Sequence, residues 1–308
     1  VYRDEETKEY YRAYDFTEPS YFLQTENIRD STPKTETALL MSEAPEGSIP
    51  LPAVMYHGLL KDPRYQNNFF ISPNLFEKDL KYLKENNYTP VFIKDLIAYV
   101  DDGVPLPEKP ILITFDDGYY NNYVYAYPLL RQYGMKAVIS IIGEYTDKAS
   151  LIGEKNPNYS YLTWEEVKEM SASGFVEIQN HSYSMHSNDY SRRASMQNPG
   201  ESLDQYRAAL QEDVGLLQEK IYEVTGVQPT AFTYPFGAIS ESSREILQSM
   251  GFRATLSCRE GINHITRDPD CLYRLKRILR APGKSSEDFF RVIAPPEQSG
   301  NELAATEP

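Results

Sequence analysis

The sequence predicts an α/β fold in which βα units wrap around a parallel barrel. From Leu51 onward, short apolar runs alternate with stretches of helical periodicity, which is the pattern of repeated βα units. The runs are apolar throughout, as expected of fully buried strands. Polar residues able to do chemistry follow several of these runs directly, at the positions where parallel barrels gather their active-site loops.

The predicted strands are short apolar segments that recur along the chain and together make roughly one barrel. They are Ala53 to Tyr56, Ile111 to Phe115, Ala137 to Ile142, Phe175 to Ile178, Ala231 to Tyr234, Ala254 to Leu256 and Leu272 to Ile278. Because helical stretches separate them, consecutive strands are expected to run parallel.

The predicted helices begin and end at recognisable residues. Ser72-Pro73 supplies an N-cap and a first-turn proline. Thr163, with Glu166 three residues later, matches a capping box, and Gly174 ends that helix. A longer apolar stripe ended by Gly226 predicts one long helix, and its members are Leu203, Leu210, Val214, Leu217, Ile221 and Val224.

The first 48 residues differ in composition from the rest of the chain. They are acidic and polar, rich in Glu and Thr, and end in a linker-like segment at 43–48. We therefore expect an N-terminal extension or linker over residues 1–48, a single large domain over 49–295 and a tail over 296–308. Apolar residues at 21–23 and 38–41 could add short strands or a turn of helix.

The chain is strongly acidic. Its 45 acidic and 31 basic residues give a formal charge of −14. This charge argues against a nucleic acid or an anionic membrane surface as the main partner. No apolar run is long enough to span a membrane. Cys258 and Cys271 could form a bridge or remain free, so they do not identify the redox compartment.

Two adjacent carboxylates, Asp116 and Asp117, follow the second predicted strand. At the end of a buried strand they would repel each other unless a cation or a proton compensated them, and a metal ion is the simplest cation. One carboxylate can then bind the metal while the other faces a water molecule. The alternative is a helix-capping Asp beside an Asp that makes a turn with Gly118.

Two histidines, His181 and His186, follow the fourth predicted strand. Residues five apart are separated by about 140° around an α-helix, so these histidines could converge on one ion only from a loop. Two imidazoles and one carboxylate leave room for water, which is the arrangement of a catalytic zinc site. A single histidine would more often be an ordinary satisfied polar residue, but a pair after a barrel strand favours ligands.

The segments Thr114–Gly118 and His181–His186 resemble the first two motifs of the polysaccharide deacetylases, carbohydrate esterase family 4, which includes chitin and peptidoglycan deacetylases. The resemblance covers about residues 50 to 295, with both motifs in family order. Met55-Tyr56-His57 and the histidine spacing are more similar to the branch that contains poly-β-1,6-N-acetylglucosamine deacetylases.

The resemblance implies a distorted (β/α)7 barrel with a divalent metal held by Asp117, His181 and His186, and with Asp116 as general base. Residues 49–295 would then be the catalytic domain. Zinc is the expected metal, although cobalt, nickel or iron suits the same ligands. The residue chemistry permits the same division, because a metal polarises the acetyl carbonyl and a carboxylate can take a proton from the attacking water.

The third motif departs from the family's commoner form, since Tyr234 stands where an orienting Arg is usual. We expect the segment Tyr234-Pro235-Phe236 to bind substrate, with the Tyr234 backbone N–H facing the oxyanion and Phe236 forming a wall of the sugar groove. The alternative is a tight turn whose aromatic rings only pack.

The last motif departs as well. Leu275-Lys276-Arg277 replaces a Leu-x-His pattern, so the usual general acid is absent. His57, directly after the first strand, is the predicted replacement, and the alternative is a structural histidine bonded to its loop. Arg277 is expected to contact substrate, and His264 is expected to be an ordinary surface residue in a loop.

Together these features predict a metal-dependent hydrolase that removes N-acetyl groups from a poly-N-acetylglucosamine-like polymer outside the cell or in the cell wall. The alternatives are a non-catalytic glycan-binding barrel and a deacetylase of peptidoglycan or an O-acetylated substrate. We expect a monomer whose partner is the polysaccharide. The resemblance also implies an extracellular or cell-surface location. The chain starts at Val1 without an initiator Met or signal-like segment, so we expect that a signal or anchor has been removed.

Overall fold

The computed structural model describes residues 2–3, 10–11, 44–187 and 192–294, and the chain divides into the units Val1–Glu36 and Thr37–Pro308. In the first unit, β1 (Tyr2–Arg3) pairs antiparallel with β2 (Tyr10–Tyr11). The apolar segments 21–23 and 38–41 and the tail 296–308 lie outside the described residues.

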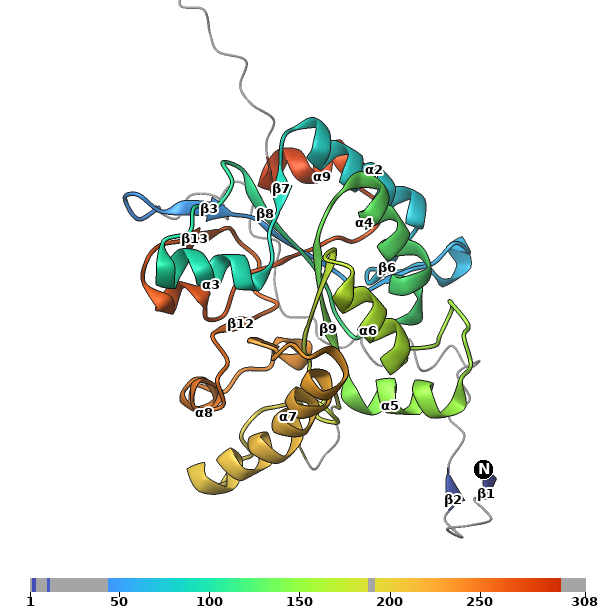
Figure 1. The fold of residues 1–308 in the computed structure, drawn as a ribbon, viewed down its shortest axis with the longest axis vertical. Helices are drawn as coiled ribbons and strands as arrows, with labels where there is room; N and C mark the ends of the chain where they lie inside the picture. The colour runs from blue at the N-terminus through green and yellow to red at the C-terminus, as the bar shows by residue number, and fades with distance from the viewer. Residues whose placement is uncertain (1, 4–9, 12–43, 188–191, 295–308) are drawn as a thin grey trace, which may run out of the picture. The chain divides into compact units, whose positions relative to one another are not determined.

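The second unit is built around a curled sheet of eight strands (Figure 1), in the order β12-β11-β10-β9-β8-β4-β14 with β7 beside β8. All neighbouring strands run parallel. The strands are β4 (Ala53–Tyr56), β7 (Thr89–Pro90), β8 (Pro110–Phe115), β9 (Ala137–Ile141), β10 (Val176–Asn180), β11 (Ala231–Thr233), β12 (Ala254–Leu256) and β14 (Ile278–Leu279). An isolated parallel bridge from Leu256 to Leu275 joins β12, at one end of the sheet, to the segment that precedes β14, at the other end. The predicted α/β barrel is thereby confirmed.

One predicted strand, Leu272 to Ile278, is wrong over most of its length. Its first residue belongs to the 3-10 helix η5 (Pro269–Leu272), and only Ile278 lies in β14. The side chain of Asp268 accepts a hydrogen bond from the N–H of Asp270 at 2.9 Å, and Pro269 occupies the first helical position. Because this cap and proline favour a helical turn, Leu272 is helical, although its apolar side chain predicted a strand.

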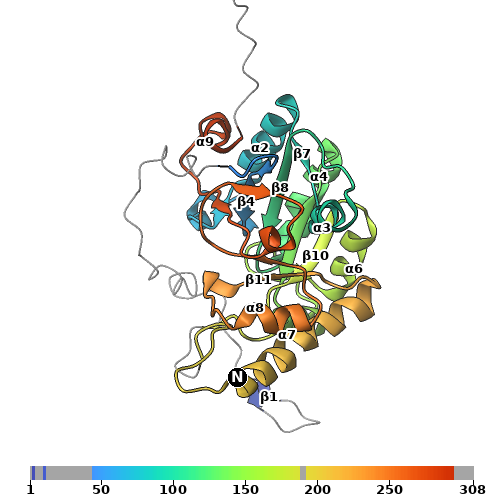
Figure 2. The same ribbon diagram turned by 90° about the vertical axis from the view of Figure 1, so that its left-hand side faces the viewer.

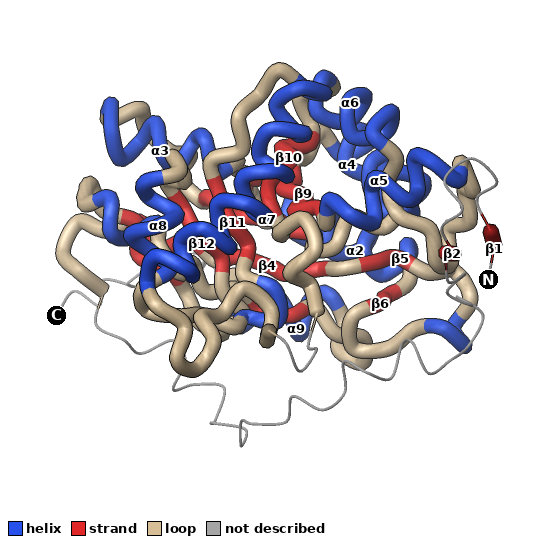
Figure 3. The backbone as a smooth tube through the Cα atoms, turned by 90° about the horizontal axis from the view of Figure 1, so that it is seen from below, coloured by secondary structure: helices blue, strands red, loops and turns tan. Residues whose placement is uncertain are grey.

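Helices surround the strands of the sheet (Figure 3). They are α2 (Pro73–Glu85), α3 (Ile93–Asp102), α4 (Tyr127–Tyr133), α5 (Gly143–Ile152), α6 (Trp164–Ala172), α7 (Leu203–Thr225), α8 (Ser243–Ser249) and α9 (Ser286–Ile293). Figure 2 shows α7 and α8 on the β11 side of the sheet and α2 and α9 on the β4 side. No helix in the described part of the chain has the length and apolarity needed to cross a membrane.

The predicted helix boundaries are confirmed by the capping contacts. Ser72 caps α2 by accepting a hydrogen bond from the Leu75 N–H at 3.1 Å, and Thr163 and Glu166 form a capping box at the start of α6. Helix α7 ends at Gly226, whose φ of 72° lies in the left-handed region that glycine tolerates.

The core is divided between the two faces of the sheet. Along β8, Ile111, Ile113 and Phe115 belong to an apolar cluster shared with α2 and α4. Leu112, which points the other way, belongs to a second cluster that includes residues of α3 and of β12. Thr114 faces the same way as Leu112 and is also fully buried.

Short elements lie outside the main sheet. β3 (Ile49–Leu51) pairs antiparallel with β13 (Asn263–Ile265), and β5 (Gly58–Leu59) pairs parallel with β6 (Phe70–Ile71). His264 therefore lies on a strand opposite Pro50, and its assignment to a loop was wrong. Three helical turns complete the description: η2 (Pro63–Tyr65), the π-helix η3 (Asn122–Ala126) and η4 (Pro235–Gly237). Cys258 and Cys271 are free.

Candidate metal centre and active site

The site forms where neighbouring strands of the sheet end. Asp116 and Asp117 come directly after β8, and His181 comes directly after β10. Both strands pair parallel with β9, so their carboxyl ends lie at the same edge of the sheet. His57 follows β4, which pairs with β8 on its other side.

Asp117, His181 and His186 converge on one point. Oδ1 of Asp117 lies 3.4 Å from Nε2 of His181 and 3.3 Å from Nε2 of His186, and the possible ligand atoms all lie within 4.8 Å of one another. The Asp117 side chain is 9% exposed and that of His186 is 17% exposed. Oδ1 of Asp117 is buried and finds no hydrogen-bond partner in the described part of the chain. Two imidazole nitrogens facing an orphaned carboxylate oxygen are the donor set of a zinc site.

His181 is oriented by a backbone carbonyl. Its Nδ1 lies 2.7 Å from the carbonyl oxygen of Thr233, at the end of β11. A carbonyl can only accept a hydrogen bond, so Nδ1 carries a proton, and in the neutral ring the lone pair on Nε2 is the one that faces Asp117. Burial would lower the pKa of His181, but without a metal the nearby carboxylates of Asp117 and Asp116 raise it, so a bound cation would take the place of the proton on Nε2. An orienting hydrogen bond of this kind is the usual companion of a metal-binding histidine.

The ionisation states of Asp117 and His186 also suit metal binding. Burial lowers the pKa of His186 to about 4, against the opposing pull of the Asp117 carboxylate. Burial alone would raise the pKa of Asp117, but the neighbouring His186 and His181 lower it below its ordinary value. At neutral pH Asp117 is therefore ionised and His186 is neutral, which are the forms that bind a cation.

Backbone strain accompanies these residues. Asp117 has a φ of 72°, and Ser182, which follows His181, has a φ of 71°. Both values lie in the left-handed region, which non-glycine residues seldom adopt. Such conformations persist where the surrounding structure fixes them, and they cluster at functional sites.

Asp116 is held by Arg277. Nη1 of Arg277 donates to Oδ1 of Asp116 at 2.6 Å, and Nη2 donates to Oδ2 at 2.8 Å. Burial would raise the pKa of Asp116, but the charge and hydrogen bonds of Arg277, with His181 and His57, together outweigh it and lower that pKa. Tyr234 stands where the third motif usually has an orienting Arg, yet Asp116 does have an Arg partner, namely Arg277. The partner comes from the segment before β14, which lies beside β4 in the sheet.

The expectation that Arg277 contacts substrate is not supported by its contacts. The residue is 0% exposed. Its Nε donates to the carbonyl of Ser257 at 3.0 Å, and Nη1 also donates to the hydroxyl of Thr114 at 3.1 Å. With its N–H groups committed to protein acceptors, Arg277 orients Asp116 instead.

His57 lies beside the same carboxylates. Its ring packs edge-on against Phe69 with the centroids 4.8 Å apart, and its buried Nδ1 finds no hydrogen-bond partner among the described residues. Burial lowers the pKa of His57, while the charges of Asp117 and Asp116 oppose that shift. Its role as a proton donor stays a prediction.

The third motif buries Tyr234 and brings Phe236 against His186. Tyr234 is 1% exposed, its hydroxyl lies 2.8 Å from Oγ of Ser243, and its backbone N–H donates to the carbonyl of Leu256 at 3.1 Å. The expectation that this N–H faces the oxyanion was therefore wrong. Phe236, after the buried Pro235, has a φ of 55° and places its ring 4.3 Å from the ring of His186.

Sequence reasoning gave no role to Asp213 on α7, which holds the loop between His181 and His186 through three hydrogen bonds. The sequence did contain a signal for the role of Asp213, in the apolar stripe of that helix. Asp213 falls between Leu210 and Val214, so this carboxylate lies on the buried face and is 8% exposed. A buried carboxylate requires partners.

Comparison with known proteins points to one family. The polysaccharide deacetylase family profile matches residues 103–255. A poly-beta-1,6-N-acetyl-D-glucosamine N-deacetylase of Escherichia coli (strain K12) is 25% identical over 279 residues, which is 85% of this chain and 41% of the relative. This chain thus spans about two fifths of that relative's length.

Two further matches cover more of the proteins compared. The Bacillus subtilis (strain 168) protein YxkH, whose name places it among polysaccharide deacetylases, is 28% identical over 271 residues, which is 88% of this chain and 83% of that protein. The structure of IcaB from Ammonifex degensii superposes with a TM-score of 0.63 and 27% identity, over 76% of this chain and 92% of that one. The sequence-based resemblance and the distorted (β/α)7 barrel are confirmed.

Proposed function

Since this chain belongs to the polysaccharide deacetylase family, we propose that it hydrolyses N-acetyl groups on an aminosugar polymer of the poly-N-acetylglucosamine type. The observation that carries the proposal is the orphaned, buried Oδ1 of Asp117 facing Nε2 of His181 and of His186. A carboxylate in that position needs a cation. A polymer substrate of this kind is met outside the cell, so we also propose an extracellular or cell-surface location.

Asp117, His181 and His186 would hold a divalent metal, with zinc as the first choice and cobalt, nickel or iron as alternatives. When bound, such an ion polarises the acetyl carbonyl and acidifies water. The protein's own contribution is to present three ligands and leave other positions open. The hydrogen bond from His181 to the Thr233 carbonyl supports this role, because it fixes the tautomer that binds metal through Nε2.

Asp116 would act as the general base. Its two bonds from Arg277 keep the carboxylate ionised and fix its plane. A carboxylate has about four lone-pair sites, so the remaining ones can still accept a proton from the attacking water. Asp116 directly precedes the proposed ligand Asp117, so the proposed base would lie beside the metal.

His57 would return the proton to the leaving amine. Support comes from its place at the end of β4, next to β8, and from its electrostatic coupling to both aspartates. Phe236 would form one wall of the substrate site, since its partly exposed ring lies against His186. Free amine and acetate are the products.

A non-catalytic glycan-binding barrel is less well supported. That alternative depended on the altered third, fourth and fifth motifs, and the third is the one that lacks the usual Arg. Arg277 supplies the missing contact to Asp116 from another part of the chain. The groups that hydrolysis would require, including an Arg that orients Asp116, are therefore more fully present than the motifs alone indicate.

The test is acetate release from N-acetylglucosamine oligomers by the zinc-loaded protein and by Asp116→Asn. Asparagine keeps the shape of the side chain but cannot take a proton, so the rate should fall by about 10²- to 10⁴-fold. Zinc binding should be unchanged, because Asp116 is not a proposed ligand. Equal release by both proteins would exclude Asp116 as the base.

A further inference from the structure

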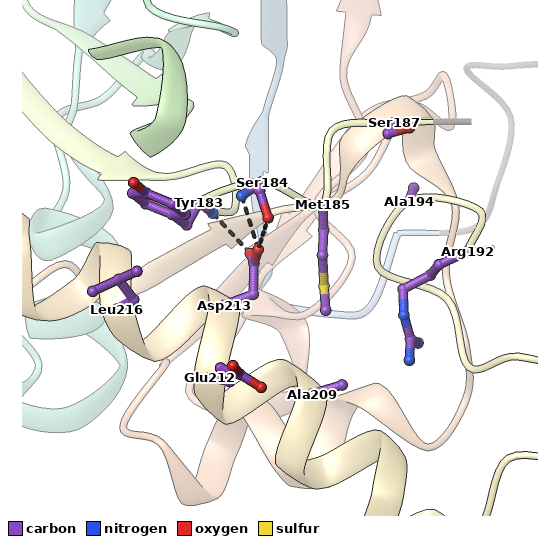
Figure 4. A pocket seen from close by; sticks show the side chains of 10 residues that line it. All are labelled: Tyr183, Ser184, Met185, Ser187, Arg192, Ala194, Ala209, Glu212, Asp213 and Leu216. Carbon is purple, nitrogen blue, oxygen red and sulfur yellow. Dashed lines mark hydrogen bonds between the residues drawn. The ribbon is translucent and has the colours of Figure 1, made fainter. Parts of the chain in front are cut away.

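We propose that Asp213 is a positioning residue that fixes the histidine loop, residues 181–186, so that His186 faces Asp117. The inference rests on the proposed function, because it concerns the centre where a metal is proposed to bind. Figure 4 shows the Asp213 carboxylate on α7 directed at the loop, beside a groove that the loop and α7 line together.

The contacts of Asp213 are specific to consecutive residues of the loop. Its Oδ1 accepts a hydrogen bond from the N–H of Tyr183 at 2.8 Å. Its Oδ2 accepts one from the N–H of Ser184 and one from the Ser184 hydroxyl, both at 2.8 Å. These donors lie between the two histidines in sequence, so the bonds fix the path of the chain from His181 to His186.

The loop needs such a partner because it has no regular secondary structure of its own. It leaves β10 at Asn180 and turns through Ser182, whose φ is 71°. Partly buried N–H groups in such a turn require acceptors, and Asp213 provides them for two successive residues. Without Asp213 these donors would be left to water, and the turn would lose its fixed direction.

Contacts on the other side of the loop come from α5 and from Asn180. The N–H groups of Gly143 and Glu144 donate to the carbonyls of Ser182 and Tyr183, at 3.1 and 2.9 Å. Asn180 accepts from the Ser182 N–H at 2.9 Å and donates to the carbonyl of Val214 at 2.9 Å. The loop is therefore held between the start of α5 and the middle of α7, and Asp213 makes the α7 contacts nearest to His186.

The chemistry of the contact requires a carboxylate. Two backbone donors approach different oxygens of Asp213, so both side-chain oxygens must accept. Asparagine has a single acceptor oxygen, and its NH₂ group would face an N–H donor. Asp213→Asn therefore removes one of the two acceptor oxygens while changing the volume of the side chain very little.

The test is an equilibrium titration of the full chain with Zn²⁺, after chelation, for the parent, Asp213→Asn and Glu212→Gln. Glu212 is the matched control, because it is the preceding residue of α7, is exposed and makes none of these bonds. We expect Asp213→Asn to bind Zn²⁺ about 10- to 100-fold more weakly than the parent, as is usual when a group that orients a ligand is lost. Glu212→Gln should bind like the parent.

A merely structural role would lower the melting temperature of the chelated protein and leave the Zn²⁺ affinity of the folded protein unchanged, and that result would overturn the inference. If Asp213→Asn does not fold, Ser184→Ala removes only the hydroxyl bond and should still weaken Zn²⁺ binding by a few fold. Unchanged Zn²⁺ affinity in Ser184→Ala would also contradict the proposed role of Asp213. Acetate release by the parent is measured in the same preparations, so that failure of the proposed function is recognised separately.

Discussion

Arg277 and Asp116 form a buried ion pair with two parallel hydrogen bonds, of 2.6 and 2.8 Å, across 161 residues of sequence. The guanidinium is 0% exposed and the carboxylate side chain is 3% exposed. Planar guanidinium and carboxylate groups match in this arrangement, so the pair fixes the orientation of Asp116 as well as its charge.

Replacing Arg277 by Lys should change the pH dependence of deacetylation. Lysine keeps the positive charge but cannot hold both carboxylate oxygens, so burial would raise the pKa of Asp116 and loosen its orientation. We expect the acidic limb of the kcat/KM profile to move to higher pH, and kcat/KM at neutral pH to fall by about 10²-fold. Acetate release measured across the pH range gives both quantities.

Arg253→Lys is the matched control for this change. Arg253 also holds a carboxylate through two bonds, to Asp101 at 2.8 and 2.7 Å, but on the surface. Its replacement should leave the profile unchanged. An acidic limb that is identical in Arg277→Lys and the parent would show that Arg277 does not set the ionisation of Asp116.

Glu177 on β10 should make the stability of the protein depend on pH. Its carboxylate accepts the N–H groups of Ile93 and Lys94 at the start of α3, at 2.7 and 3.2 Å. Burial outweighs these bonds and raises the pKa of Glu177 from 4.5 to about 7. The folded protein thus keeps a proton that the unfolded chain loses at lower pH, and the stabilisation is complete below about pH 4.5 and is lost as the pH rises through about 7.

Urea unfolding of the parent and of Glu177→Gln at pH 4.5 and pH 8 measures this effect. Between these values the free energy of unfolding of the parent should fall relative to that of the variant, by up to about 3 kcal/mol. Ionisation of other groups affects both proteins alike. A difference between parent and variant that is the same at both pH values would contradict the assignment to Glu177.

Gly143→Ala should disturb the histidine loop from the α5 side. A Cβ at this position would lie 2.5 Å from Cδ2 of Tyr183 and 3.2 Å from its Cα, so the backbone of the loop would have to shift. We expect Zn²⁺ to bind about 10-fold or more weakly to this variant, because Tyr183 lies in the segment that connects His181 to His186.

Gly215→Ala is the control for the added methyl group. A Cβ at Gly215, within α7, would meet only Cε of Met250 at 3.8 Å, an ordinary contact. Alanine should stabilise that helix by about 0.4–1 kcal/mol and leave zinc affinity unchanged. Equal zinc affinity in Gly143→Ala and Gly215→Ala would show that a shift of the histidine loop does not weaken Zn²⁺ binding.

Much of the fold could be predicted because local signals determine it, and the convergence of the ligands could be predicted because it follows from the topology of a parallel sheet. Apolar runs and capping residues such as Ser72 and Thr163 depend on neighbours in sequence. Asp117 and His181 converge because each follows a strand of the same parallel sheet. Topology alone places such residues at one edge.

The errors within the site concern contacts that depend on distant segments of the chain. The pairing of Arg277 with Asp116 arises because β14 closes onto β4, which the sequence around Arg277 does not reveal. The N–H of Tyr234 is used by Leu256 of the next strand, so a motif position alone could not show whether it was free. Asp213 acquires its role only when α7 lies beside the histidine loop.

The central claim is that Asp117, His181 and His186 hold the metal on which deacetylation depends. The most direct measurement is Zn²⁺ binding to the chelated full chain and to Asp117→Asn, together with acetate release from N-acetylglucosamine oligomers. We predict that the parent binds one Zn²⁺ per chain and loses activity on chelation until Zn²⁺ returns, and that the variant binds about 100-fold or more weakly. Equal Zn²⁺ affinity in the two proteins, or full acetate release by the chelated parent, would contradict the claim.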